Sequence, residues 1–252
     1  MKKYRLILAA AVLAAGIFPL HAQSGGGPGA PQFDSGMDKL FGDNQTFSAM
    51  LEVQMNNGVN PTTVSGKMSF DKGNSRFEMN MADMKGGNIT PDTVAQMKSM
   101  GMDRMISISQ KDKKTVYVIY PNAQAYVEVA SADSDSGATN SDAKMETTEL
   151  GKETVDGHPC VKNKDVITDQ QGTKHEFTVW NATDLKNFPI KIEINEQGND
   201  ITQSFRNVNF SKPDASLFNP PAGCTKYDSM QEMMQAVVMK HMGGMGAPPA
   251  GQ

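Results

Sequence analysis

The sequence is poor in the residues that most often build reactive sites. It has two cysteines, four histidines and one tryptophan in 252 residues. It contains no C-x-x-C, G-x-S-x-G or H-E-x-x-H motif and no glycine-rich phosphate loop, which are the patterns of dithiol redox, serine hydrolase, zinc protease and nucleotide sites. We therefore predict a protein that is not an enzyme and that has no catalytic residue and no cofactor.

Groups of metal ligands are also sparse. His158 and Cys160 stand two positions apart, but a zinc site needs at least three protein ligands. The spacing of the remaining histidines supplies no third ligand, so no metal site is predicted from these residues.

An excess of positive charge is absent as well. Lysine and arginine total 24 against 28 aspartates and glutamates, which gives a formal net charge of −4. Binding to phosphate backbones needs clustered lysine and arginine, so nucleic acid is excluded as the expected partner.

Only one long apolar run is present, Leu6–Phe18, and it lies close to the first residue. Three basic residues precede the run and the small residue Ala22 follows it, which is the order of a secretory signal peptide. The alternative, a membrane anchor, needs about 20 apolar residues. We predict cleavage near Ala22, with no cysteine there to carry a lipid. The mature protein is then periplasmic or secreted, does not span a membrane, and has a net charge of −7 because three positive charges are lost.

Composition divides the rest of the chain into four parts. We expect a flexible N-terminal linker at 23–44, a β-sheet domain at 45–228, a methionine-rich C-terminal helix at 229–242 and a disordered tail at 243–252. The linker and the tail are rich in glycine and proline and offer little to pack.

Alternation of apolar and polar residues dominates the central part. Leu51 and Val53, Met79 and Met81, and the triplet Ile190, Ile192 and Ile194 each recur at every second position, which is the period of a half-buried strand. Short Asn-Gly, Asp-Gly and Gln-Gly turns separate such runs and favour antiparallel pairing. The fold class is therefore α+β and mainly β.

Two helices are predicted beside the strands. Thr90 and Pro91 suit the first positions of a helix at 91–100, and Gly101 suits its end. Ser229 and Glu232 form a capping box at the start of the second helix. The residues Met230, Met233, Met234 and Val237 then share one face of that helix.

The methionines are the least usual part of the composition, because 19 are present. Three interpretations remain open. They pack a plain apolar core, they form an adaptable hydrophobic groove, or their soft thioethers bind Cu(I).

The two cysteines suggest one structural bridge. An oxidising compartment and an even cysteine count predict a disulfide between Cys160 and Cys224. It would close a loop of about 64 residues and contribute about 4 kcal/mol. The alternative is a pair of free thiols.

Several short segments carry a family resemblance. They are the strand Arg76–Met79, the pair 117–121 and 126–128 around a proline turn, the stretch from Trp180 through Phe188-Pro189 to Ile194, and the segment Phe218–Cys224. Together they resemble, over roughly residues 45–228, an uncharacterised family of secreted bacterial proteins that is itself similar to the periplasmic lipoprotein-carrier (LolA-like) superfamily. The resemblance implies a curved antiparallel sheet, a half-barrel, that wraps around covering helices and shelters lipid or acyl chains.

We therefore expect a soluble, non-catalytic periplasmic protein that binds a hydrophobic or lipidic ligand between sheet and helices. The residues expected to contact the ligand are apolar: Leu51, Val53, Met79, Met81, Ile190, Ile192, Ile194, Met230, Met233, Met234 and Val237. The alternatives are a methionine-based copper- or oxidant-handling protein and an envelope scaffold or sensor domain whose partner is another envelope protein.

Overall fold

The computed structural model describes residues 37–243, except positions 57, 59, 88, 131–143, 169–171, 173, 197 and 198. The predicted signal peptide with its cleavage at Ala22 and nearly all of the predicted tail lie outside the described residues. In the described part of the chain, no helix is both long enough and apolar enough to cross a membrane.

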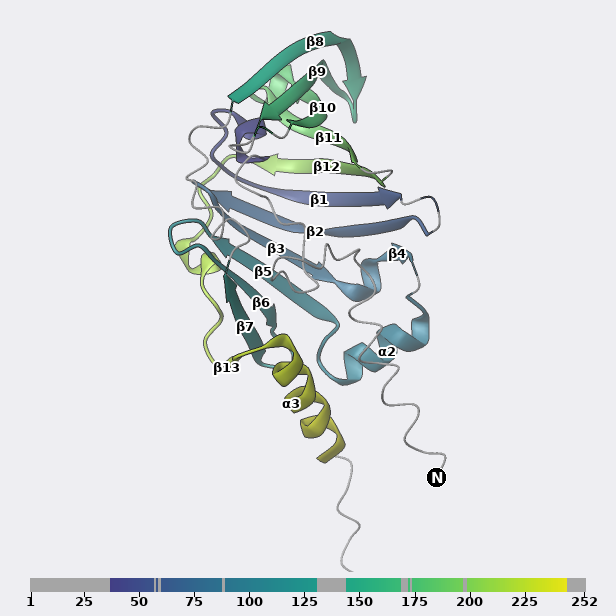
Figure 1. Ribbon diagram of the computed structural model, residues 1–252, viewed down its shortest axis with the longest axis vertical. Coiled ribbons are helices and arrows are strands. Elements are labelled where there is room, and N and C mark those ends of the chain that lie inside the picture. Colours follow the sequence, from purple (N-terminus) through teal and green to yellow (C-terminus); the bar gives the residue numbers. More distant parts are fainter. Residues whose placement is uncertain are drawn as a thin grey trace, which may run out of the picture.

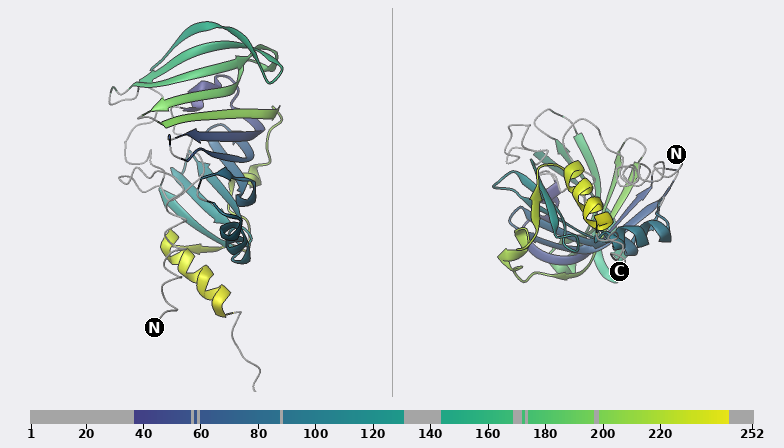
Figure 2. Two further views of the ribbon diagram at one scale, coloured as in Figure 1. Left: turned by 90° about the vertical axis from the view of Figure 1, so that its right-hand side faces the viewer. Right: turned by 90° about the horizontal axis from the view of Figure 1, so that it is seen from below.

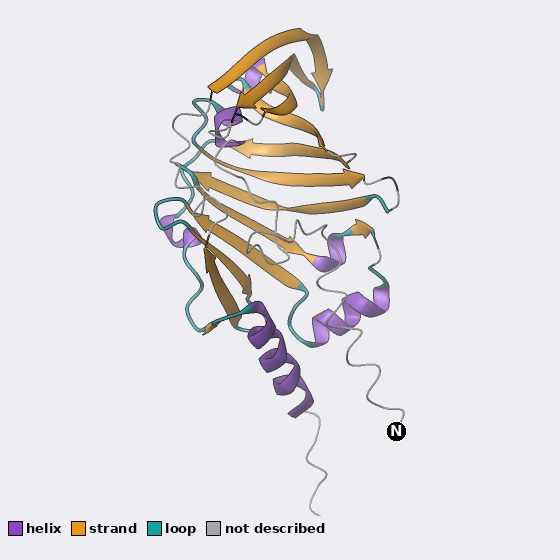
Figure 3. Cartoon of the chain, in the orientation of Figure 1, coloured by secondary structure: helices purple, strands orange, loops and turns teal. Residues whose placement is uncertain are grey.

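A single large sheet makes up most of the molecule (Figures 1 and 3). Its strands are β1 (Thr46–Asn56), β2 (Thr62–Asp71), β3 (Asn74–Asn80), β4 (Lys85–Gly86), β5 (Arg104–Gln110), β6 (Thr115–Tyr120), β7 (Ala125–Ala130), β8 (Lys144–Val155), β9 (His158–Thr168), β10 (Lys174–Ala182), β11 (Phe188–Glu196), β12 (Asn199–Asn209) and β13 (Thr225–Tyr227). The helical elements are η1 (Met37–Phe41), η2 (Met81–Asp83), α2 (Pro91–Ser99), η5 (Thr183–Leu185), η6 (Ala215–Phe218) and α3 (Met230–Gly243).

The 13 strands follow the order β13-β7-β6-β5-β3-β2-β1-β12-β11-β10-β9-β8, and β4 pairs with β2 off this path. Every pairing is antiparallel except that of β13 with β7. The prediction of a mainly β, antiparallel fold with two helices is confirmed. β1 and β12 pair with each other in the middle of this order. Their pairing joins the strands β1–β7 to the strands β8–β12 in one sheet.

Two-residue turns set several of these pairings. Lys72 and Gly73 between β2 and β3 both have positive φ, at 50° and 87°. Asp156 and Gly157 between β8 and β9 do the same, at 48° and 86°. Two successive positive φ values give the turn whose twist matches that of an antiparallel hairpin, so the flanking strands pair directly.

The sheet curls (Figure 2). α3 lies at its β7 and β13 end, whereas α2 lies beside β4 (Figure 1). The Thr90 hydroxyl accepts a hydrogen bond from the Thr93 amide at 3.2 Å and starts α2. The Ser229 hydroxyl accepts from the Glu232 amide at 3.1 Å and starts α3. Both helices form where their capping residues predict them.

A group of five phenylalanines packs at the middle of the sheet. Phe41 of η1 contacts Phe47, Phe70, Phe188 and Phe205, with ring centroids 4.9–5.7 Å apart. All five are almost fully buried. The packed part of the chain therefore begins before residue 45, within the stretch expected to be a linker.

The predicted disulfide is wrong. Cys160 lies in β9 and Cys224 directly precedes β13, and both are free thiols. These strands are ten places apart in the sheet order, which at about 4.8 Å per strand is far beyond the roughly 7 Å that a disulfide allows between Cα atoms. Burial raises the pKa of both thiols.

Candidate hydrophobic binding face

One face of the sheet is apolar across its central strands. We call it the inner face, because it is the side of the curve on which α3 packs (Figure 2). The strand register places one row of side chains next to each other from β2 to β10: Val64, Val53, Gln203, Ile192 and Val179. Each member of this row is at most 4% exposed.

A second row runs beside the first. It is formed by Met55 of β1, Ile201 of β12, Ile194 of β11 and Phe177 of β10. Phe177 is buried, whereas the other three are half-buried and pack against the same core. The least buried part of the central inner face is therefore this second row.

Gly66 on β2 makes room for a close contact within the inner face. It pairs with Leu51 on one side and Met79 on the other. A Cβ atom at this position would lie 2.6 Å from the Phe77 ring and 2.4 Å from the Glu78 carbonyl oxygen. Only glycine lets the Phe77 ring lie across the strand here.

The residues that the sequence predicts as ligand contacts come together. Eight of them are buried in one apolar cluster: Leu51, Val53, Met79, Met81, Ile190, Ile192, Met233 and Val237. The other three, Ile194, Met230 and Met234, are half-buried against that cluster. The structure thus gathers the whole set, while its contact with a ligand stays a prediction.

Met81 reaches this cluster from a different element than the alternation implies. β3 ends at Asn80, whose side-chain oxygen accepts a hydrogen bond from the Ala82 amide at 2.9 Å. This cap turns the chain into η2, and Met81 is its first residue.

The terminal helix closes one end of the sheet. α3 contacts β7 and β13, and its Met233 is 0% exposed while Met239 on its other side is 72% exposed. In the described residues, no group of three or more histidines, cysteines, aspartates or glutamates gathers in one place. The buried methionines of β3, β5 and α3 all lie among apolar neighbours.

Sequence reasoning missed two kinds of residue on the inner face. The phenylalanines Phe41 and Phe205 were not singled out, because their partners are distant in the chain. Polar residues within the face were also missed: Gln203 and Asp165 are 4% and 5% exposed. Within the described residues, Oε1 of Gln203 and Oδ1 of Asp165 have no hydrogen-bond partner.

Asp165 lies on β9 next to Phe177 of β10 and Thr147 of β8. Burial raises the pKa of its carboxyl group, and a hydrogen bond from Thr147 lowers it in part. Burial has the larger effect, so the pKa of the Asp165 carboxyl group lies above its usual value.

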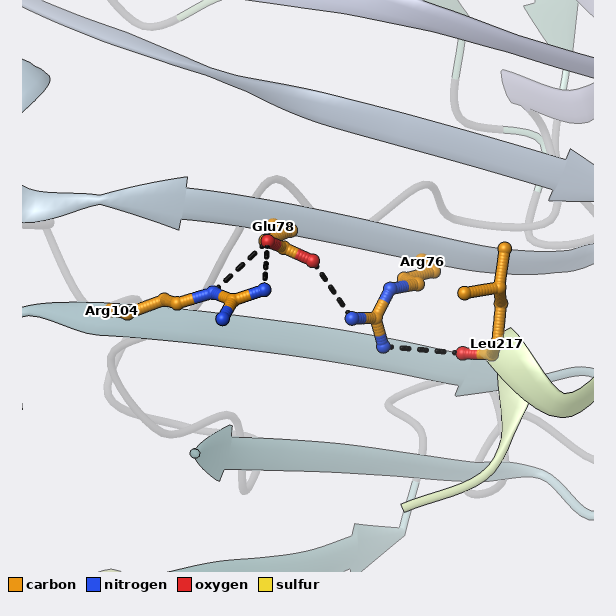
Figure 4. Close-up of polar contacts among 4 residues, drawn as sticks. All are labelled: Arg76, Glu78, Arg104 and Leu217. Atoms are coloured by element: carbon orange, nitrogen blue, oxygen red, sulfur yellow. Dashed lines mark hydrogen bonds and ion pairs between the residues drawn. The ribbon is translucent and has the colours of Figure 1, made fainter. Parts of the chain in front are cut away.

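On the opposite face of the sheet, charged side chains of β3 and β5 bond to one another (Figure 4). The Glu78 carboxylate accepts hydrogen bonds from Arg76, at 2.8 Å, and from Arg104. Arg76 also donates to the Leu217 carbonyl oxygen at 3.2 Å and so ties η6 to the sheet. Burial acts to raise the pKa of Glu78, but the two arginines outweigh it and hold that pKa below its usual value.

η6, which this hydrogen bond anchors, covers a smaller apolar cluster on the outer side of β5 and β6. Phe218 of η6 packs there against Ile106, Ile108, Tyr117 and Ile119. The outer face at this end is therefore closed by the chain itself.

A family model described as a domain of unknown function, DUF4412, matches residues 47–188, more than half of the chain. The chain belongs to the DUF4412 family. The DUF4412 match begins in β1 and ends at the first residue of β11, so it covers Leu51, Val53 and Met79 but neither β12 nor α3. No curated protein matches the sequence.

The solved structures that match the chain include one LolA superfamily protein, the superfamily that the sequence resemblance also names. A LolA superfamily protein from Nitrosomonas europaea is 10% identical over 73% of this chain and 94% of its own, with a TM-score of 0.36. The lipoprotein LppX from Mycobacterium tuberculosis is 13% identical over 68% and 92%, with a TM-score of 0.39. MucB of Pseudomonas aeruginosa, solved with MucA, is 16% identical over 75% and 61%, with a TM-score of 0.38. At these identities and TM-scores, the likeness says nothing about the ligand of the DUF4412 protein.

Proposed function

We propose that this DUF4412 protein is a non-catalytic binding protein for a hydrophobic or lipidic ligand, which lies against the inner face of the sheet. One observation carries the proposal: apolar side chains occupy most of the inner face over β2, β1, β12, β11 and β10, where Thr62 and Gln203 are buried polar exceptions. Contact with apolar surface is worth about 25 cal/mol per Å² removed from water.

The position of the helices supports the same function. α3 packs on the β7 and β13 end of the sheet, and its Met233 and Val237 belong to the same apolar cluster as Val53 and Ile192. A ligand against the half-buried second row would contact the same apolar cluster that α3 closes at its other end. The proposal also includes release from the membrane by signal cleavage near Ala22 and work in the periplasm, where a free carrier must keep apolar chains from water.

The proposal is tested by filling the least buried part of the inner face. We expect Ile194→Trp to weaken the binding of a parinaric acid probe by about tenfold, because the indole occupies area that the acyl chain would cover. Probe fluorescence during titration into the mature protein measures the change.

Glu193→Trp is the matched control, since Glu193 is the preceding residue on β11 and points to the opposite face. It adds the same side chain outside the inner face and leaves the probe affinity unchanged. Absence of probe binding by the wild-type protein would sink the proposal, as would equal losses in the two variants.

A further inference from the structure

Gln203 is a polar residue in the middle of the apolar inner face. On β12 it lies directly between Val53 of β1 and Ile192 of β11. Ile201 and Phe205, two positions away along the same strand, face the same side. Gln203 therefore has apolar residues beside it on both neighbouring strands and on both sides along its own strand.

The Oε1 atom of Gln203 is buried and unpaired within the described part of the chain. A buried acceptor without a donor costs free energy, and natural proteins keep few of them. An apolar side chain of similar length at position 203 would remove that cost and continue the row. The glutamine at this position therefore points to a hydrogen-bond donor from outside the described residues.

The other two unpaired oxygens in the described residues have structural explanations. The Gln110 amide donates to the Phe218 carbonyl oxygen at 2.5 Å, which holds η6 against β5. The Asp165 carboxyl group accepts a hydrogen bond from Thr147 of β8, and β8 is mostly exposed. Among the described residues, Gln203 has no comparable anchoring hydrogen bond, and its two neighbours on the adjacent strands, Val53 and Ile192, are buried.

We propose that the ligand of the inner face is an acyl chain bearing a hydroxyl group, which donates a hydrogen bond to Oε1 of Gln203. This inference rests on the proposed function and adds the chemical class of the ligand. One hydroxyl suits one acceptor among apolar neighbours, because the rest of the chain contacts Val53 and Ile192 without a polar mismatch. A bulky headgroup would press further polar atoms against those two side chains.

The test compares myristic acid with a set of hydroxymyristic acids that carry the hydroxyl at different positions. Each displaces parinaric acid from the mature protein. We expect the best-placed hydroxyl isomer to bind the wild type about tenfold more tightly than myristic acid. In Gln203→Leu that preference disappears, so that myristic acid and the hydroxyl isomer bind with similar affinity.

Gln54→Leu is the matched control. Gln54 is exposed on the opposite face of the neighbouring strand β1, so this variant keeps the preference for the hydroxyl isomer. Gln203→Met, which keeps an unbranched side chain, gives a second measurement if Gln203→Leu fails to fold. The melting temperature of either ligand-free Gln203 variant is expected to be at least that of wild type, because the unpaired acceptor is gone.

Equal affinity for myristic acid and every hydroxyl isomer would overturn this inference and leave the proposed function standing. A preference that survives in both Gln203 variants would also overturn it. Failure of myristic acid and every isomer to bind the wild type would instead remove the proposed function itself, and this inference with it.

Discussion

Asp165 is a carboxylic acid placed where apolar residues are expected. It lies beside Phe177 on the inner face and is 5% exposed. Because burial raises its pKa in the folded protein, the folded state binds this proton more readily than the unfolded state does. The ionised form of Asp165 therefore lowers the stability of the folded protein. Stability falls as the pH rises from the usual pKa of an aspartate through the raised pKa of the folded state, and the loss remains at neutral pH.

Asp165→Asn is thus expected to stabilise the protein at neutral pH. Asparagine keeps an acceptor for Thr147 and removes the charge that burial opposes. Urea unfolding at several pH values measures the gain, which shrinks as the pH falls to where the wild-type carboxyl group is protonated in both states. The exposed Asp112 is the control, and Asp112→Asn changes stability little at any pH. A gain at position 165 that is independent of pH would contradict this account.

Individual residues also show what could be predicted from sequence. The alternation at Ile190, Ile192 and Ile194 and the caps at Thr90 and Ser229 are local signals, and the structure follows them. The burial of Gln203 could not be predicted from the sequence, because it depends on β1 and β11 and not on the residues next to Gln203 in the chain.

Among the elements, α3 shows how methionines can serve packing. Met233 is fully buried against the core, whereas Met239 on the same helix is 72% exposed. We expect Met233→Ala to lower the free energy of unfolding by about 2–4 kcal/mol, since it leaves a cavity under the helix.

Met239→Ala is the matched control and is expected to change that free energy by less than about 0.5 kcal/mol. Chemical denaturation of the mature protein measures both variants. Similar small effects for the two substitutions would mean that α3 does not pack on the sheet in solution.

The order of the strands in the sheet was harder to predict from the sequence than the positions of the strands themselves. Hairpins such as β2–β3 follow from their turns, but the pairing of β1 with β12 joins residues about 150 positions apart. That pairing puts β9 and β13 near opposite ends of the sheet. The disulfide prediction failed for this reason, because a cysteine count and a cellular compartment contain no information about strand order.

Taken as a whole molecule, the chain is one curved sheet with two chemically different faces. On the outer face, hydrogen bonds among Arg76, Glu78 and Arg104 link β3 to β5, and Arg76 also bonds to η6. η6 covers the apolar cluster of this face. The inner face presents apolar rows, and α3 packs against the same apolar cluster at the β7 and β13 end. An apolar face of this extent is the basis for proposing a carrier of acyl chains.

The most direct test of that claim is mass spectrometry of the small molecules released from gently purified mature protein, with Ile194→Trp prepared in parallel. The account predicts an acyl-chain lipid bound to the wild-type protein and a much smaller amount bound to Ile194→Trp. Wild-type protein that carries no lipid and takes up none when incubated with acyl-chain vesicles would contradict it.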